Sequence, residues 1–171
     1  MKKKSKYSMT PETEQSARGS FILWLLDKSI PWHTQINPSR KAWNISVRDF
    51  LNYPEGSLGW SLGQFYVCQG FEPIAKAERH DVFHVLLGYS TSLTDEGAMQ
   101  FFLLGNGKPS FLTIGTCLLF ICLFPLQLPA MLKAFRRGQG ATNIRHWDFR
   151  ALLAEPTHSL QHQIFTQTHV L

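Results

Sequence analysis

Charged residues and cysteines are both scarce in this chain of 171 residues. Charged side chains make up 17% of the sequence, where about 25% is usual. The three cysteines, Cys68, Cys117 and Cys122, are odd in number and show no Cys-x-x-Cys spacing, which argues against a disulfide scaffold, a cysteine zinc site and a dithiol redox motif. Because they lie among apolar residues, we interpret them as reduced, buried thiols in a reducing compartment.

The pattern of a half-buried strand is also missing. Strict alternation of apolar and polar residues persists nowhere, and no internal repeat is visible. Apolar residues instead recur at helical spacing, as at i, i+4, i+7 and i+8 within 58–66. We therefore predict an all-α, single-domain helical bundle over residues 10–171, behind a disordered basic tail over residues 1–9.

Positive charge is in excess only near the amino terminus. Lysine plus arginine is 17 and aspartate plus glutamate is 12, but Lys2, Lys3, Lys4 and Lys6 supply four of the positive charges. The rest of the chain is nearly neutral, so we expect no nucleic-acid partner, whereas such a tail suits weak attraction to anionic lipid. A secretory signal is not supported, because the apolar run 21–26 is too short.

Capping residues and turn clusters divide the chain into predicted helices. We expect Thr94 to cap the helix over 95–104 and Gly105 to end it. Loops are expected over 32–40, 52–56 and 138–142. The full set of predicted helices is 10–28, 41–51, a helix from Leu58 to Gly70, 73–88, 95–104, 143–154 and 156–166.

The segment 111–132 is apolar and contains no charged residue. Its length would allow it to cross a bilayer, but Pro125 and Pro129 break a straight helix. Three interpretations stay open: a membrane span, a buried core helix, and the wall of a lipid tunnel or an interfacial helix.

The segment His80-Asp81-Val82-Phe83-His84 carries the clearest chemical signal. At 100° per residue, His80, Asp81 and His84 fall on one narrow arc of a helix, and two imidazoles at i and i+4 can reach one metal ion. Apolar residues cover the rest of this helix, so an ionised Asp81 is costly there unless it is paired or bound to a metal.

Glu96 lies 12 residues after His84, in the first turn of the next predicted helix. A tight turn around Gly88 makes the two helices antiparallel neighbours and returns Glu96 to the level of the histidines. Two nitrogens and one or two carboxylate oxygens suit zinc with an open position, or iron or manganese with more ligands. We therefore predict a metal site formed by His80, Asp81, His84 and Glu96.

Other interpretations of the histidines remain. A lone His-x-x-x-His pair on a helix is more often structural than metal-binding. The phosphohydrolases named for a His-Asp pair use such a dyad with a further His and Asp, roles that His33 and Asp148 could fill, although nothing around them in the sequence supports this. His158 and His162 have no acid in their turn, and we interpret both as surface residues.

The metal motif and several turns resemble the coenzyme Q (ubiquinone) biosynthesis protein 4 family. His80-Asp81-x-x-His84, followed by eleven residues and Glu96, matches the family's H-D-x-x-H-x(11)-E signature. Over roughly 49–160, further short stretches are similar: the turn 53–59 (Y-P-E-G-S-L-G), Gly70-Phe71-x-Pro73, Leu86-Leu87-Gly88, the turn 105–109 and Phe135-Arg136-Arg137-Gly138.

The resemblance implies an all-helical protein in which His80, Asp81, His84 and Glu96 hold Zn²⁺ or another divalent metal such as Fe²⁺. It also implies an apolar tunnel for a polyprenyl lipid or quinone precursor, and a cytoplasmic protein peripheral to the inner membrane. The family acts in ubiquinone biosynthesis and is linked to decarboxylation, with hydroxylation, at ring carbon 1 of a polyprenylated 4-hydroxybenzoate. Association with other enzymes of that pathway and a homodimer are further expectations.

Three functions therefore compete. In the first, the protein is an enzyme of carboxy-lyase type, with His80, Asp81, His84 and Glu96 as catalytic residues and Asp81 either a ligand or a group that orients a histidine. In the second, it is a non-catalytic prenyl-lipid-binding scaffold that organises biosynthetic enzymes around a structural metal. In the third, it is a small membrane protein anchored through residues 111–132.

Overall fold

The chain folds as a helical bundle. The computed structural model describes residues 41–166, and the expected tail over 1–9, the helix over 10–28 and the loop over 32–40 lie outside them. The predicted all-α, single-domain fold is confirmed, since the described residues form helices and no strand. These are α3 (Val47–Leu51), α4 (Leu58–Gln69), α5 (Glu78–Leu87), α6 (Leu93–Gly105), α7 (Phe111–Leu123), the 3-10 turn η1 (Pro125–Gln127), α8 (Leu128–Gln139) and α9 (Thr157–Phe165).

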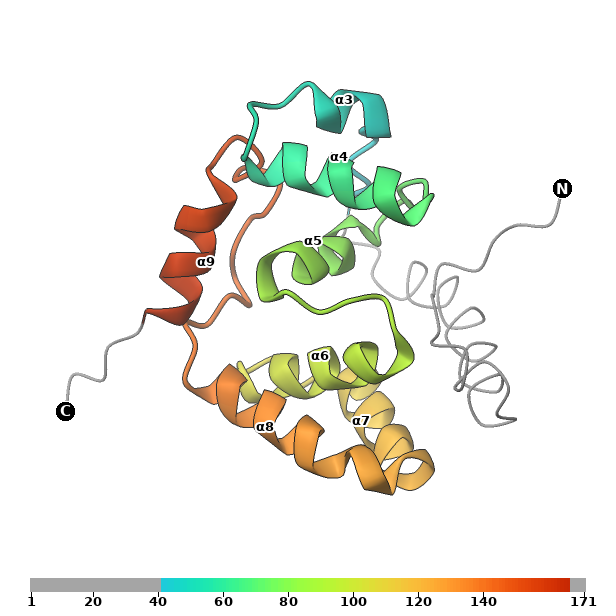
Figure 1. Ribbon diagram of the computed structural model, residues 1–171. Helices are drawn as coiled ribbons and strands as arrows, with labels where there is room; N and C mark the ends of the chain where they lie inside the picture. Colours follow the sequence, from blue (N-terminus) through green and yellow to red (C-terminus); the bar gives the residue numbers. More distant parts are fainter. Residues whose placement is uncertain (1–40, 167–171) are drawn as a thin grey trace, which may run out of the picture.

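Helix α5 lies in the middle of the molecule. Figure 1 shows it between α3 and α4 at one end and α6, α7 and α8 at the other, with α9 along one side. The core that joins these layers includes Leu62 of α4, Phe83 of α5 and Phe102 of α6, each no more than 1% exposed. The helix that carries the histidine pair is therefore held by packing on several sides.

The turn between α5 and α6 reverses the chain, as predicted. Gly88 ends α5 with φ of 73°, a left-handed conformation that costs glycine little because it has no Cβ. The expected cap at Thr94 is wrong: α6 begins at Leu93, because the Ser92 hydroxyl accepts a hydrogen bond from the Asp95 amide at 3.3 Å. The helix ends with Asn106 as its cap, one residue beyond the expected stop.

Three predicted helices are shorter than expected or absent. The helix over 73–88 begins only at Glu78, because Lys76 has a left-handed φ of 68°. The helix over 41–51 begins only at Val47, because Ser46 and Asp49 form a reciprocal capping box. Residues 143–154 form turns without an α-helix. The Arg79 guanidinium donates hydrogen bonds to the carbonyl oxygens of residues 144, 145 and 147, which a helix would use internally.

Helix α8 runs through Gly138, where a loop was expected, because it crosses α6 in backbone contact. A Cβ at Gly138 would overlap the carbonyl oxygen of Phe102, and one at Gly105 would overlap that of Phe135. Both glycines therefore serve close approach of two helices, not chain reversal.

The apolar segment is divided at Pro125 and only half covered. Phe120 and Cys117 of α7 are buried, whereas Phe111 is 99% and Leu118 58% exposed, so α7 is not the fully buried core helix that was one of the interpretations. Among the described residues, no single helix is long and apolar enough to span a membrane; a pair covering 113–123 and 125–139, bent by 108°, meets the length and composition requirements together.

The cysteine prediction holds for one residue of the three. Cys117 is buried, and burial raises the pKa of its thiol to about 11, which keeps it protonated and unreactive. Cys68 and Cys122 are exposed. Apolar neighbours in the sequence did not bury them, because both lie on faces of α4 and α7 that no other helix of residues 41–166 covers.

The crossing of α6 and α8 predicts opposite effects for two glycine substitutions. Gly138→Ala should lower the free energy of unfolding by about 1–3 kcal/mol, because the added methyl group would displace the backbone of α6 at Phe102. Gly115→Ala in α7, whose Cβ would meet no atom within 4 Å, should raise it by about 0.5–1 kcal/mol. Urea unfolding of both variants checks this, and equal effects would contradict the crossing.

Candidate metal centre

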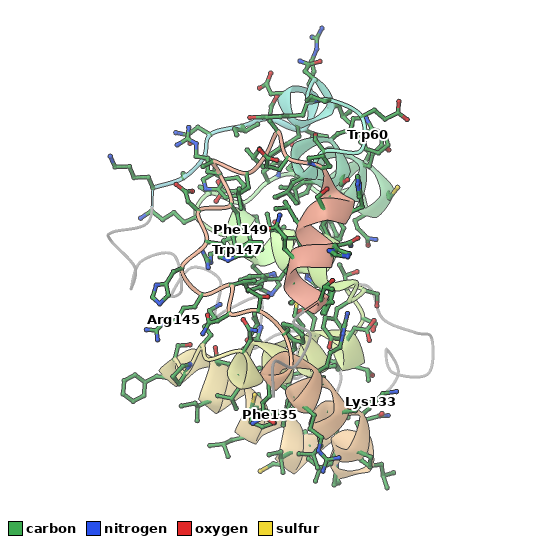
Figure 2. All side chains as sticks on the ribbon, turned by 90° about the vertical axis from the view of Figure 1, so that its left-hand side faces the viewer. Trp60, Lys133, Phe135, Arg145, Trp147 and Phe149 are labelled. Carbon is green, nitrogen blue, oxygen red and sulfur yellow. The ribbon has the colours of Figure 1, made fainter. Side chains whose placement is uncertain are left out.

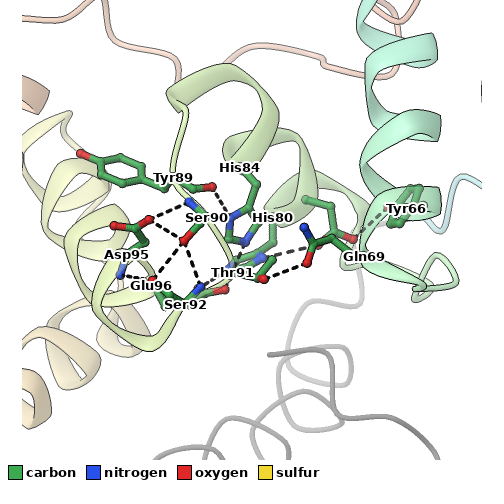
Figure 3. A network of polar contacts seen from close by, with 11 residues as sticks. Tyr66, Gln69, His80, His84, Tyr89, Ser90, Thr91, Ser92, Asp95 and Glu96 are labelled. Carbon is green, nitrogen blue, oxygen red and sulfur yellow. Dashed lines mark hydrogen bonds and ion pairs between the residues drawn. The ribbon is translucent and has the colours of Figure 1, made fainter. Parts of the chain in front are cut away.

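Two consecutive helices bring three candidate ligands together. His80 and His84 lie one turn apart on α5, and Glu96 lies in the first turn of α6. The turn over 88–92 sets the distance between the helices: Ser90 donates from its amide and hydroxyl to Asp95 Oδ2 at 2.9 and 2.6 Å. Glu96 is thereby held opposite the histidines, as the sequence predicted, and Figure 3 shows these side chains beside that turn.

One carboxylate faces both imidazole rings. Glu96 Oε2 lies 3.3 Å from His80 Nε2, and Glu96 Oε1 lies 3.1 Å from His84 Nε2. One ligand atom from each of the three residues can be chosen so that all lie within 4.8 Å of one another. The geometry therefore offers two nitrogens and a carboxylate to a single ion.

The His84 ring is oriented so that its Nε2 needs a cation. Its Nδ1 lies 3.0 Å from the Tyr89 carbonyl oxygen, which can only accept, so Nδ1 carries the proton. Phe65 stacks on the ring, with centroids 5.5 Å apart and planes 13° apart. In the neutral ring Nε2 then presents a lone pair to Glu96 Oε1, and neither of these buried atoms has a hydrogen-bond partner.

The Glu96 carboxylate is ionised at neutral pH in this environment. Burial by itself raises the pKa of Glu96. The neighbouring His80 and His84, when charged, lower it by more than burial raises it, to about 2. A buried carboxylate facing an imidazole lone pair is strongly unfavourable unless a proton or a metal ion lies between them. The site therefore requires positive charge at its centre.

The donor set fits a divalent metal ion. Zinc holds nitrogen and oxygen ligands at about 2.0–2.2 Å, which places neighbouring ligand atoms of a tetrahedron about 3.3 Å apart. The separations of 3.1 and 3.3 Å are of this size but involve different oxygens of Glu96, and a set with one ligand atom from each residue lies within 4.8 Å. The side chains of His84 and Glu96 are 1% and 4% exposed, but that of His80 is 29% exposed, so the site can be reached from the His80 side.

Asp81, the fourth predicted residue, lies behind His80 and is not one of the three grouped ligands. Its carboxylate is fully buried: Oδ2 accepts a hydrogen bond from the Tyr66 hydroxyl at 2.9 Å, and Oδ1 lies 3.6 Å from His80 Nδ1. This position fits the orienting role that the sequence left open beside ligation. A ligand role for Asp81 stays a prediction.

Tyr66 is the functional residue that sequence reasoning missed. Its helical spacing marked it as an apolar core position, and it is indeed fully buried. Burial and the nearby Asp81 raise the pKa of its phenol well above the usual value, so it remains a hydrogen-bond donor. A buried tyrosine hydroxyl usually has a hydrogen-bond partner, and a buried aspartate needs one. This shared requirement was the signal that could have linked Tyr66 to Asp81.

The other candidate residues lie outside this group. His158 and His162 are exposed, as predicted. Asp148 accepts hydrogen bonds from the amides of Arg150 and Ala151 in its own turn, and His33 lies outside the described residues.

Asp148 also borders a pocket of about 190 Å³, which is lined by Lys41, Trp43, Lys76, Glu78, Arg79, Asp148 and Phe149. Its charged lining differs from the expected apolar tunnel, which the described residues do not show.

Comparison with known proteins identifies the fold alone. No family model and no curated protein sequence matches this chain. A similar solved structure is that of a protein from Nostoc punctiforme, provisionally assigned to ubiquinone biosynthesis. It is 16% identical, with a TM-score of 0.60, and the match covers 91% of this chain and 84% of that one.

The contact between Tyr66 and Asp81 predicts a loss of metal affinity at a distance. Tyr66→Phe removes only the hydroxyl group, so Asp81 Oδ2 loses one hydrogen-bond donor. We expect metal to bind about 10–100-fold more weakly and the free energy of unfolding to fall by about 1–3 kcal/mol. Tyr53→Phe, at a partly buried tyrosine of the 52–56 turn, is the matched control. Metal titration followed by calorimetry checks the difference, and equal affinities would contradict an orienting role.

Proposed function

We propose that this protein binds a divalent metal through His80, His84 and Glu96 and acts in ubiquinone biosynthesis on a polyprenylated 4-hydroxybenzoate-type ring. The observation that carries the proposal is the buried Glu96 carboxylate, whose Oε1 lies 3.1 Å from His84 Nε2 and whose Oε2 lies 3.3 Å from His80 Nε2. The spaced motif of these residues and the fold shared with the Nostoc punctiforme protein support the pathway assignment.

The residues around such a site have different roles. His84 and Glu96 are fixed, since Tyr89 and Phe65 hold the ring and the 88–92 turn holds the carboxylate. Asp81 orients His80, whose partly exposed ring borders the open side of the site. The ion, when bound, supplies positive charge for a ring carboxylate or lowers the pKa of water.

The reaction proposed is loss of the carboxyl group at ring carbon 1 with hydroxylation there. A para hydroxyl donates electron density to that carbon, which favours departure of carbon dioxide. Replacing the carboxyl group by a hydroxyl group is a two-electron oxidation, for which dioxygen would supply the oxygen atom and accept the electrons. Because zinc has no redox chemistry, activation of dioxygen requires iron in the site or an external partner. The metal's identity therefore decides whether the protein could act without a partner.

In a second candidate function, the metal at this site is structural and not catalytic. The exposed apolar residues of α7, such as Phe111 and Leu118, favour a scaffold that holds a prenyl lipid or quinone precursor and recruits other biosynthetic enzymes. Peripheral attachment to a membrane and a homodimer belong to either version of the proposal.

Metal content tests the ligand set. The purified full-length protein should contain about one divalent ion per chain, and His84→Ala and Glu96→Ala should contain little. His158→Ala, at an exposed histidine on α9, should match the wild type. Elemental analysis by mass spectrometry gives both the amount and the identity of the metal, and equal content in all four proteins would refute the ligand assignment.

Conversion of a prenylated 4-hydroxybenzoate separates the enzyme from the scaffold. The metal-loaded wild type, supplied with oxygen, should consume the substrate and release carbon dioxide, and Glu96→Ala should do neither. Lipid extracted from the purified protein is analysed in parallel. Bound prenyl lipid without conversion by any loaded form would favour the scaffold, and the absence of both would reject the pathway assignment.

A further inference from the structure

The charged pocket at the start of α5 has no part in the candidate metal centre. It has a volume of about 190 Å³, and its lining comes from three segments, 41–43, 76–79 and 148–149, none of which contains a candidate ligand. Phe149 packs against Phe83 of α5 with ring centroids 5.7 Å apart, and Figure 2 shows Phe149 close to α5. We call this cavity the Glu78 pocket, after its buried acid.

Glu78 brings a buried carboxylate to this pocket. The residue is 3% exposed, and its Oε1 accepts a hydrogen bond from the Trp43 amide at 3.0 Å. Within residues 41–166, no hydrogen bond or ion pair involves its second oxygen, Oε2. A buried carboxylate oxygen is costly without a donor. The pocket is the space from which a donor can reach Glu78, so the site favours a ligand that carries an ammonium or other N–H group.

Two lysines balance the acids of the pocket. Lys41 and Lys76 line it together with Glu78 and Asp148. Arg79, the fifth charged residue, donates to backbone carbonyl oxygens of the neighbouring loop. Lys76 also has a left-handed φ of 68°, a strained conformation for lysine of the kind that clusters at ligand-binding sites. The pocket thus offers separate positive and negative groups, and apart from Arg79 their charges cancel.

The size and walls of the pocket limit the ligand further. Because a water molecule takes about 30 Å³ in the liquid, a pocket of 190 Å³ has the volume of about six waters. Pockets for drug-sized ligands are larger, at roughly 300–1,000 Å³. The half-buried Trp43 supplies an apolar wall. A nucleotide is therefore too large for the pocket, whereas a metabolite of amino-acid size fits.

We propose that the Glu78 pocket binds a free α-amino acid with a short apolar side chain. The ammonium group of the ligand donates to Glu78 Oε2, and its carboxylate lies beside Lys41 and Lys76. Its side chain packs against Trp43. A zwitterion matches the two sets of charges separately, whereas a simple carboxylate would leave Glu78 without a donor and would be repelled by it. The inference goes beyond the proposed function, because it needs neither the metal nor a ubiquinone precursor.

Calorimetric titration of the full-length protein with L-leucine tests the ligand class. The wild type should bind leucine and should bind each of two analogues about tenfold more weakly or worse. The first, 4-methylpentanoate, lacks the ammonium group, and the second, 3-methylbutylamine, lacks the carboxylate. Each analogue leaves one charged group of the pocket without its partner, and a site built to pair a polar group rejects a ligand that lacks it.

Two variants that remove charge place the binding in the Glu78 pocket. Glu78→Gln keeps an acceptor oxygen for the backbone amide and loses the negative charge, so it should fold and bind leucine about tenfold more weakly. Lys41→Gln, at an exposed residue, should also weaken binding. Glu55→Gln and Lys133→Gln, at exposed residues outside the pocket, are the charge-matched controls and should bind like the wild type.

Three results would overturn the proposal. These are no binding of leucine by the wild type, equal binding of leucine and 4-methylpentanoate, and equal binding by Glu78→Gln and Glu55→Gln. A lower melting temperature of Glu78→Gln, together with the first result, would show that the carboxylate only supports the fold. His80→Ala should lose metal and keep leucine binding, so failure of the proposed function and failure of the pocket are distinguishable.

Discussion

The structure around the candidate centre depends on one buried carboxylate that faces two imidazoles. Glu96 is 3% exposed, and an ionised group at that depth would cost several kcal/mol if it stood alone. Its two oxygens instead approach His80 and His84 at 3.3 and 3.1 Å. Each histidine has a further constraint: Tyr89 fixes the proton of His84, and Asp81 lies beside His80. A positive charge at the centre therefore stabilises the Glu96 carboxylate and both imidazole rings together.

A short turn makes this meeting of helices reproducible. Gly88 reverses the chain, Ser92 begins α6, and Asp95 ties the turn through Ser90. None of these residues approaches the site as a ligand, yet each one limits where Glu96 can lie. The side chains of Ser90, Ser92 and Asp95 are thus satisfied within the turn, while the adjacent carboxylate is left for the histidines. This division explains how a buried acid can be positioned accurately by a segment of surface polar residues.

The sequence predicted the local parts of the site better than the distant ones. The spacing of His80, His84 and Glu96, with Gly88 between them, follows from helix geometry and one left-handed glycine, and these three of the four candidate ligands come together. The role of Tyr66 depends on how α4 packs against α5, which spacing within one helix does not encode. The same holds for residues 143–154, whose helical pattern is overridden because Arg79, far away in sequence, takes their carbonyl oxygens.

Helix α6 connects the centre with α7, whose outer side is exposed. Gly97, the neighbour of Glu96, lies so close to the ring of Phe120 that a Cβ there would overlap it, and Phe120 is the inward side of the helix whose outer stripe is exposed. Only the thickness of α7, about 10 Å for a helix with its side chains, therefore separates the backbone beside Glu96 from the outer surface. The open side of the centre is instead that of His80, whose side chain is 29% exposed, so α7 closes the centre from one direction while His80 borders the way in.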